Sequence, residues 1–289
     1  MQRVNRAIEL LSQGQPVYSS VVGEPGYERG REHARTWADC LILDVEHQPF
    51  EPAALHAFMR GLVDGGPTAS GHRTPAVLVT LPTDGSSGEV VRANAWMVRQ
   101  ALAAGVHGPL LCHAETPAAV RAFVEAARYP FQRMGVGHGL DEGRRGAGGQ
   151  VVAAAIWGLP AEAYLDRADV WPLNPAGELM LGLKIENRRA LDNVEASLPV
   201  PGVAFAAWGP GDMGMAFGHK DAHDPPYPPE MAAARTRVKA ACERTGVMFL
   251  EMVRAEDVIA QIEDGVRICA AISDAAEIGR RHSKRTLPW

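Results

Sequence analysis

Three short motifs in the 289-residue sequence combine side chains that can bind a cation and move protons. They are DVEH at 44–47, KIE at 184–186 and GPGD at 209–212. Carboxylates are the ligands that hard divalent cations prefer, and an imidazole exchanges a proton near neutral pH. The sequence therefore indicates acid–base chemistry assisted by a positive charge.

Glu186 and Asp212 are the candidate metal ligands, because each follows an apolar run. A carboxylate at the rim of a packed interior needs a cationic partner. That partner is either Lys184, which points to the same side of a strand as Glu186, or a metal ion. With water and substrate oxygens completing the shell, the two carboxylates suit Mg²⁺ or Mn²⁺.

Short apolar runs alternate with segments of helical period along the chain. Runs such as LILDV and AVLVTL are apolar on both faces, which is typical of parallel strands covered by helices. The expected strands span 16–22, 40–46, 76–82, 109–114, 179–186, 204–208, 247–253 and 266–272. The expected helices span 51–64, 89–104, 116–128, 160–167, 188–198, 229–245, 255–263 and 274–284.

Eight such alternations predict a (β/α)8 barrel forming one domain over 1–289. An open doubly wound sheet is the alternative, but no GxGxxG motif follows the first strand. Active sites of barrels lie at the C-terminal ends of the strands, where all three motifs are expected. The Gly- and Pro-rich region 136–179 is expected to be an extended loop that covers the site.

Composition excludes several classes of protein. The chain has 29 Lys+Arg against 34 Asp+Glu, a net charge of −5, which argues against nucleic acid as a partner. It has no apolar run of 18 residues, so neither a transmembrane helix nor a membrane partner is expected. Its four cysteines are isolated and no signal peptide is recognisable, which predicts a cytoplasmic protein with reduced, buried thiols. The basic residues at 280–285 are expected to form a solvated face or a subunit contact.

The order of the motifs resembles that of the HpcH/HpaI aldolase family, the class II pyruvate aldolases. The matching stretches are DCLILDVEHQPF, RYPFQRMGVG and the segment that begins LKIENRR and ends GPGDMGMAFG. The most specific feature is Glu186, followed after 26 residues by Asp212 in a GPxD turn. The resemblance implies a (β/α)8 barrel, often with a C-terminal helix exchanged between subunits, and a homo-oligomer such as a trimer or hexamer.

The resemblance also implies a metal-dependent aldolase. Members of the family cleave or form the C–C bond of a 4-hydroxy-2-oxo acid through a pyruvate enolate, with an aldehyde as the second partner. Glu186 and Asp212 match the two carboxylate ligands of a divalent cation, Mg²⁺, Mn²⁺ or Co²⁺.

Other site residues follow from the same match. His47 matches the acid–base histidine, and Asp44 matches the aspartate that supports it. Gly209 and Gly211 lie in the turn whose backbone N–H groups hold the substrate carboxylate. Trp208, just before this turn, either narrows the substrate pocket or packs in the core.

The sequence departs from the family where strand three ends, because VLVTLP lacks the expected arginine. Lys184 stands where many relatives have an uncharged residue, and Cys112 and His113 follow strand four. We hypothesise that Lys184, or else Arg92, supplies the missing positive charge in catalysis. In a metal-free alternative Lys184 is a Schiff-base nucleophile. The plain alternative is an ion pair with Glu186.

Other functions remain open from the sequence. The same scaffold supports other enolate chemistry, such as oxaloacetate decarboxylation or an acyl-CoA lyase reaction. The missing arginine also leaves room for a non-catalytic protein that binds a 2-oxo acid.

Overall fold

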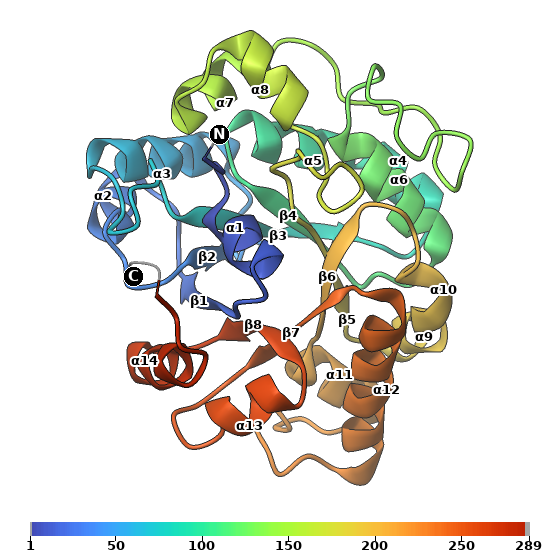
Figure 1. Cartoon of the computed structure of the whole chain (residues 1–289). Coiled ribbons are helices and arrows are strands. Elements are labelled where there is room, and N and C mark those ends of the chain that lie inside the picture. Colours follow the sequence, from blue (N-terminus) through green and yellow to red (C-terminus); the bar gives the residue numbers. More distant parts are fainter. Residues whose placement is uncertain (1, 287–289) are drawn as a thin grey trace.

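Eight parallel strands close into a barrel in the computed structural model, which describes residues 2–286 (Figure 1). Consecutive strands pair in parallel around the ring, and β8 pairs with β1. The strands are β1 Val17–Val22, β2 Cys40–Leu43, β3 Ala76–Asp84, β4 Gly108–Cys112, β5 Leu181–Ile185, β6 Val203–Trp208, β7 Met248–Met252 and β8 Val266–Ala270. Each overlaps one predicted strand, so the predicted (β/α)8 barrel is confirmed.

Side chains on the two faces of the strands build two separate apolar layers. Cys40 and Ile42 of β2 point into the barrel interior with Leu78 and Phe205. Leu41 and its outward-facing neighbours pack against the surrounding helices instead. This double burial explains why the strands appear in the sequence as continuous apolar runs.

Helices surround the barrel and one helix closes its N-terminal end. In Figure 1, α1 lies across the ring of strands, and its apolar residues join the interior layer. The helices are α1 Arg6–Ser12, α2 Tyr27–His33, α3 Pro52–Asp64, α4 Gly88–Ala93, α5 Ala95–Ala103, α6 Pro117–Ala127, α7 Gln150–Trp157, α8 Ala161–Arg167, α9 Arg188–Asp192, α10 Val194–Ser197, α11 Pro210–Phe217, α12 Pro229–Thr245, α13 Val258–Glu263 and α14 Ser273–His282.

The region 136–179 does not cover the active-site end, which corrects the expectation from its glycines and prolines. It contains α7 and α8, and it packs beside the N-terminal end of β4. Trp157 of α7 stacks on His107, one residue before β4, with ring centroids 5.5 Å apart. Its indole N–H donates to the carbonyl of Gly105 at 2.8 Å. Aromatic packing therefore holds this segment at the opposite end of the barrel from the motifs.

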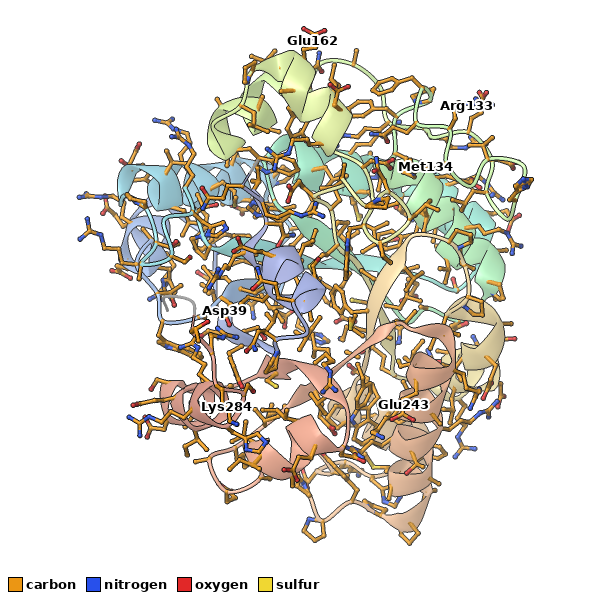
Figure 2. All side chains as sticks on the ribbon, viewed as in Figure 1. Asp39, Arg133, Met134, Glu162, Glu243 and Lys284 are labelled. Carbon is orange, nitrogen blue, oxygen red and sulfur yellow. The ribbon has the colours of Figure 1, made fainter. Side chains whose placement is uncertain are left out.

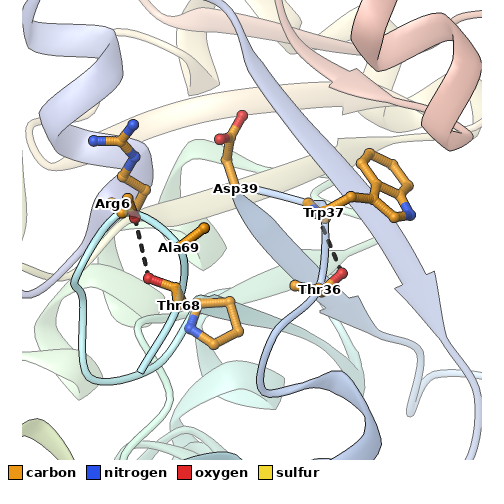
Figure 3. A pocket seen from close by; sticks show the side chains of 9 residues that line it. Arg6, Thr36, Trp37, Asp39, Thr68 and Ala69 are labelled. Carbon is orange, nitrogen blue, oxygen red and sulfur yellow. Dashed lines mark hydrogen bonds between the residues drawn. The ribbon is translucent and has the colours of Figure 1, made fainter. Parts of the chain in front are cut away.

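The C-terminal helix α14 and the residues after it are fixed to their own barrel by buried ion pairs, so the expectation of a solvated basic face is wrong for Arg280 and Arg285. Arg285 donates to both oxygens of Asp39 at 2.7 and 2.9 Å, and Arg280 lies 3.4 Å from the same carboxylate. Figures 2 and 3 show Asp39 at the N-terminal end of the barrel. The exchange of this helix between subunits stays a prediction.

Two further expectations concern the thiols and the membrane. Cys40, Cys112, Cys242 and Cys269 are all buried and unpaired, as predicted. Within residues 2–286, no helix combines the length and apolar character needed to cross a bilayer.

Candidate active site

The C-terminal ends of four strands bring the three sequence motifs to one rim of the barrel. The first motif follows β2, the second lies at the end of β5, and the third follows β6. Residues at the end of β4 complete the group. The side chains that meet there are those of Asp44, Glu46, His47, Cys112, His113, Lys184, Glu186 and Asp212.

Lys184 lies at the centre of this cluster. Its ammonium forms ion pairs with Oε2 of Glu46 and, at 2.6 Å, with Oε2 of Glu186. Oδ2 of Asp212 lies 3.8 Å away. Burial by itself lowers the pKa of Lys184, but the anionic surroundings formed with Cys112, Glu186 and Glu46 outweigh it and raise the pKa. Lys184 is therefore a charged ammonium, which is the wrong state for a Schiff-base nucleophile.

Glu186 is fully buried and is fixed on both sides. Its Oε1 accepts a hydrogen bond of 2.8 Å from the backbone N–H of His113. Burial raises its pKa, and the nearby Lys184 ammonium opposes that rise. A Cβ on Gly209 would lie 2.6 Å from Oε2, so only glycine allows the β6 end to approach this carboxylate.

Asp212 comes to the rim on the first turn of α11. Pro210 stands at the first helical position, where a missing N–H costs nothing, and Gly209 is the N-cap residue. Nε2 of His47 lies 4.0 Å from Oδ2 of Asp212 and 3.5 Å from Oε2 of Glu46. The imidazole is half exposed, at 56 %, and thus faces the open mouth of the barrel.

Asp44 shapes the turn that carries His47, rather than contacting its ring. Oδ1 of Asp44 accepts hydrogen bonds from the backbone N–H groups of Glu46 and His47 at 3.1 and 3.4 Å. The Thr80 hydroxyl donates to the same oxygen at 2.9 Å and accepts from the N–H of Val45 at 3.0 Å. Thr80 lies on β3, in the VLVTLP stretch that lacks the family's arginine.

Trp208 lies away from this cluster, among the residues that face the helices. It is buried, and its indole N–H donates to Oε1 of Glu251 at 3.1 Å. Its ring packs edge-on against Tyr227 at 4.9 Å between centroids. Trp208 therefore takes the core-packing alternative considered from the sequence, because its neighbour Ala207 is the residue that faces the barrel interior.

Glu46, Cys112 and His113 belong to the cluster but were not singled out as site residues from the sequence. Glu46 binds Lys184, and His113 has Nε2 3.6 Å from Oε1 of Glu46. Asn187 also joins the cluster, with Nδ2 3.2 Å from Nδ1 of His113. Glu46 could have been found from the DVEH motif, which ends an apolar strand. Its carboxylate is a second partner for the buried Lys184 ammonium, beside Glu186. Nothing in the sequence distinguished His113 from an ordinary rim histidine.

The donor set fits a divalent cation. Oε1 of Glu46 is buried and accepts no hydrogen bond from residues 2–286, whereas Oε2 of Glu186 is buried against the Lys184 ammonium. Glu46, Cys112 and Glu186 offer ligand atoms within 4.8 Å of one another. Several carboxylates at a partly buried rim are costly unless cations compensate their charge. A metal ion at this rim would add to the compensation that Lys184 provides, with Asp212 at the open side.

A parallel barrel with an acidic cluster and a histidine at its C-terminal rim defines a class of protein: (β/α)8-barrel enzymes that place acid–base side chains at the strand ends. The particular family follows from comparison with known proteins. A model of the HpcH/HpaI aldolase/citrate lyase family matches residues 31–274, and the chain belongs to this family.

Individual relatives support the assignment. The chain is 28 % identical over 223 residues to a 2-keto-3-deoxy-L-rhamnonate aldolase of Klebsiella pneumoniae, covering 77 % of this chain and 70 % of that protein. It is 28 % identical over 252 residues to a hydroxypyruvate/pyruvate aldolase of Sagittula stellata, covering 87 % and 84 %. An HpcH/HpaI family structure from Burkholderia cenocepacia has the same fold, with a TM-score of 0.69, 23 % identity and coverage of 94 % and 93 %. The predicted family and carbon–carbon lyase class are confirmed.

Proposed function

We propose that this chain is a divalent-metal-dependent aldolase that cleaves or forms the C–C bond of a 4-hydroxy-2-oxo acid, with pyruvate or a close analogue and an aldehyde as partners. The observation that carries the proposal is the convergence of Glu46, Glu186 and Asp212 from three strand ends beside His47. Two relatives named for 2-oxo acid substrates support the substrate class.

Glu186 and Asp212 are the proposed metal ligands. Their hard carboxylate oxygens suit Mg²⁺ or Mn²⁺, and Co²⁺ as a substitute. When bound, the cation would neutralise negative charge that develops on the 2-oxo acid's oxygens as the C–C bond breaks. Lys184, 3.8 Å or less from both ligands, would add positive charge that the end of β3 does not provide.

The first turn of α11 is the proposed site for the substrate carboxylate. The N–H groups of Gly211 and Asp212 precede the helix's own hydrogen-bond ladder, whose first donor after Gly209 is Met213. Unpaired N–H groups and the helix dipole favour an anion at this position. Glycines at 209 and 211 let the turn pack closely, because a Cβ would lie 2.6 Å from Oε2 of Glu186 at 209 and 2.9 Å from Nδ1 of His223 at 211.

His47 is the proposed acid–base group for the C4 hydroxyl of the substrate. An imidazole exchanges protons near neutral pH, and this one is reachable from solvent beside two carboxylates. Asp44 fixes the turn and thereby the position of His47, so we assign it a positioning role.

The test is pyruvate release from a panel of 4-hydroxy-2-oxo acids with Mg²⁺, Mn²⁺, Co²⁺ or EDTA. We expect activity that EDTA removes and a divalent cation restores. Glu186→Gln and Asp212→Asn should each abolish the metal response, because each removes a charged ligand. Full metal-dependent activity in either variant would overturn the ligand assignment.

The same experiment separates the rival functions. Turnover of oxaloacetate but of no 4-hydroxy-2-oxo acid would identify a decarboxylase, and turnover restricted to acyl-CoA substrates would identify an acyl-CoA lyase. Silence across the panel, together with tight pyruvate binding, would identify a 2-oxo acid binding protein.

We also propose a homo-oligomer, a trimer or hexamer as in the family. Three large apolar residues around the ends of β1, β7 and β8 are more than half exposed: Val21 at 63 %, Met252 at 52 % and Ile272 at 64 %. They line one groove, and exposed apolar patches of this kind mark contact surfaces. Ile272→Asp should reduce the mass measured by light scattering after gel filtration, whereas Val151→Asp, on α7, should not.

A further inference from the structure

The Lys184 ammonium occupies a position that a metal ion would also favour. Three carboxylate oxygens from three different strand ends surround it: Oε2 of Glu46, Oε2 of Glu186 at 2.6 Å and Oδ2 of Asp212 at 3.8 Å. Oxygen ligands that converge on one point are the arrangement a hard cation requires.

Both oxygens of Glu186 already have a polar partner. Its Oε1 is engaged by the backbone N–H of His113 at 2.8 Å. Its Oε2 has the Lys184 ammonium at 2.6 Å. A metal ion that binds Glu186 through Oε2 must therefore approach the same oxygen as the ammonium. Two cations this close in a buried site repel each other strongly, since the surroundings screen charge less than water does.

The contact with Glu46 gives the ammonium an alternative partner. Glu46 is held on the opposite side of the mouth by the β2 turn, through hydrogen bonds from its N–H to Asp44 and Thr80. Lys184 can therefore release Glu186 and keep Glu46. Its side chain is a flexible four-carbon stem, which permits such a change without a backbone shift.

We propose that Lys184 is a built-in counter-ion that holds the carboxylates when the metal is absent and is displaced from Glu186 when the metal binds. This inference rests on the proposed metal ligands Glu186 and Asp212. Lys184 then lowers the metal affinity of the site and stabilises the metal-free protein. It is a positioning residue that regulates how readily the site is filled.

The experiment is a calorimetric titration of the full-length protein with Mn²⁺ at constant pH. We expect Lys184→Gln to bind Mn²⁺ at least tenfold more tightly than the unsubstituted chain, because the competing charge is gone. Lys184→Arg, which keeps the charge, should bind no more tightly than the unsubstituted chain. Lys284→Gln removes the same charge from an exposed residue far along the chain and should change nothing. Glu186→Gln should abolish the binding in both backgrounds.

Thermal unfolding provides a second measurement that does not depend on activity. Without metal, Lys184→Gln should melt at a lower temperature, because it leaves buried carboxylates without a counter-ion. Mn²⁺ should raise its melting temperature by more than that of the unsubstituted chain. Equal or weaker Mn²⁺ binding by folded Lys184→Gln, or no binding by either protein, would overturn the inference. Absence of pyruvate release with this binding pattern intact would overturn the proposed function alone.

Discussion

The backbone N–H of His113 and the carboxylate of Glu186 are joined by a hydrogen bond of 2.8 Å that crosses from β4 to β5. His113 adopts a positive φ of 45°, a conformation that non-glycine residues rarely adopt. The bond fixes Oε1 of Glu186 and turns Oε2 toward the barrel mouth. The orientation of the proposed metal ligand therefore depends on a backbone N–H group. A sequence motif, which describes side chains, does not predict this contact.

Replacement of Gly209 by alanine should damage the metal site without altering any ligand. The added Cβ would lie 2.6 Å from Oε2 and 2.8 Å from Cβ of Glu186, so the carboxylate must move. We expect Mn²⁺ affinity to fall about tenfold or more, equivalent to at least about 1.4 kcal/mol. Calorimetry measures this change. Gly146→Ala is the control, because nothing lies within 4 Å of its added Cβ; equal affinities in the two variants would contradict the prediction.

Thr80→Val tests the turn that carries His47. The hydroxyl of Thr80 donates to Asp44 and accepts from the N–H groups of Val45 and Glu46, so its loss leaves polar groups unpaired. We expect the free energy of unfolding to fall by about 1–3 kcal/mol and pyruvate release to slow. Urea denaturation measures the first effect.

Thr83→Val, three residues further along β3, is the matched control for Thr80→Val. The Thr83 hydroxyl is buried and has no hydrogen-bond partner among residues 2–286. Its replacement by an apolar group of the same shape should be neutral or slightly stabilising. If both substitutions cost the same, the Asp44–Thr80 contact does not hold the turn.

The barrel was predictable because burial on both faces of a strand leaves a continuous apolar run, as in LIL of β2 and AVLV of β3. The α12 helix, Pro229–Thr245, has the predicted bounds, since a proline begins it and Gly246 ends it with φ of 73°. By contrast, α11 was not expected as a helix. Its sequence PGDMGMAF contains two glycines, which disfavour a helix in isolation, and tertiary packing stabilises it instead: Met213 is buried, and the helix contacts α9 and α12.

The candidate site was predictable in its residue types and less so in its contacts. The order of the motifs predicts that Glu186, Asp212 and His47 meet at one rim, because the C-terminal ends of parallel strands lie at the same end of the barrel. Side-chain direction was harder: Trp208 is one residue past the inward-facing Ala207 and so points outward. An ion pair between Lys184 and Glu186 was one of the alternatives that the sequence left open. The second partner of Lys184, Glu46, lies 138 residues away in the sequence, a separation that spacing rules do not bridge.

Asp39→Asn tests whether α14 is anchored on its own barrel. Asp39 is the shared partner of Arg280 and Arg285, both buried, and the substitution removes the carboxylate charge that both guanidinium groups contact. We expect a loss of about 3–5 kcal/mol in the free energy of unfolding, measured with urea. Mn²⁺ affinity should not change, because this ion-pair cluster lies at the opposite end of the barrel. Asp274→Asn, at an exposed position on α14, is the control; a similar loss there would argue against the anchor.

His107 should make the protein sensitive to acid. Complete burial, together with repulsion from His72, lowers the pKa of His107 from 6.5 to about 3. Its Nδ1 accepts a hydrogen bond from the N–H of Val77 at 3.1 Å, which requires the neutral ring. The unfolded chain takes up a proton below pH 6.5 and the folded chain does not, so the stabilisation is complete above that pH and declines as pH falls toward 3.

Between pH 7 and pH 4.5, this one group should cost roughly 3 kcal/mol of unfolding free energy. His107→Asn keeps an acceptor for Val77 and cannot titrate. It should be less stable at pH 7, because it loses the stack on Trp157, but its stability should fall by roughly 3 kcal/mol less on acidification. His138→Asn, at an exposed loop position, should leave the pH dependence unchanged. Urea denaturation at both pH values measures the difference, and identical pH dependence in all three proteins would show that His107 does not control acid stability.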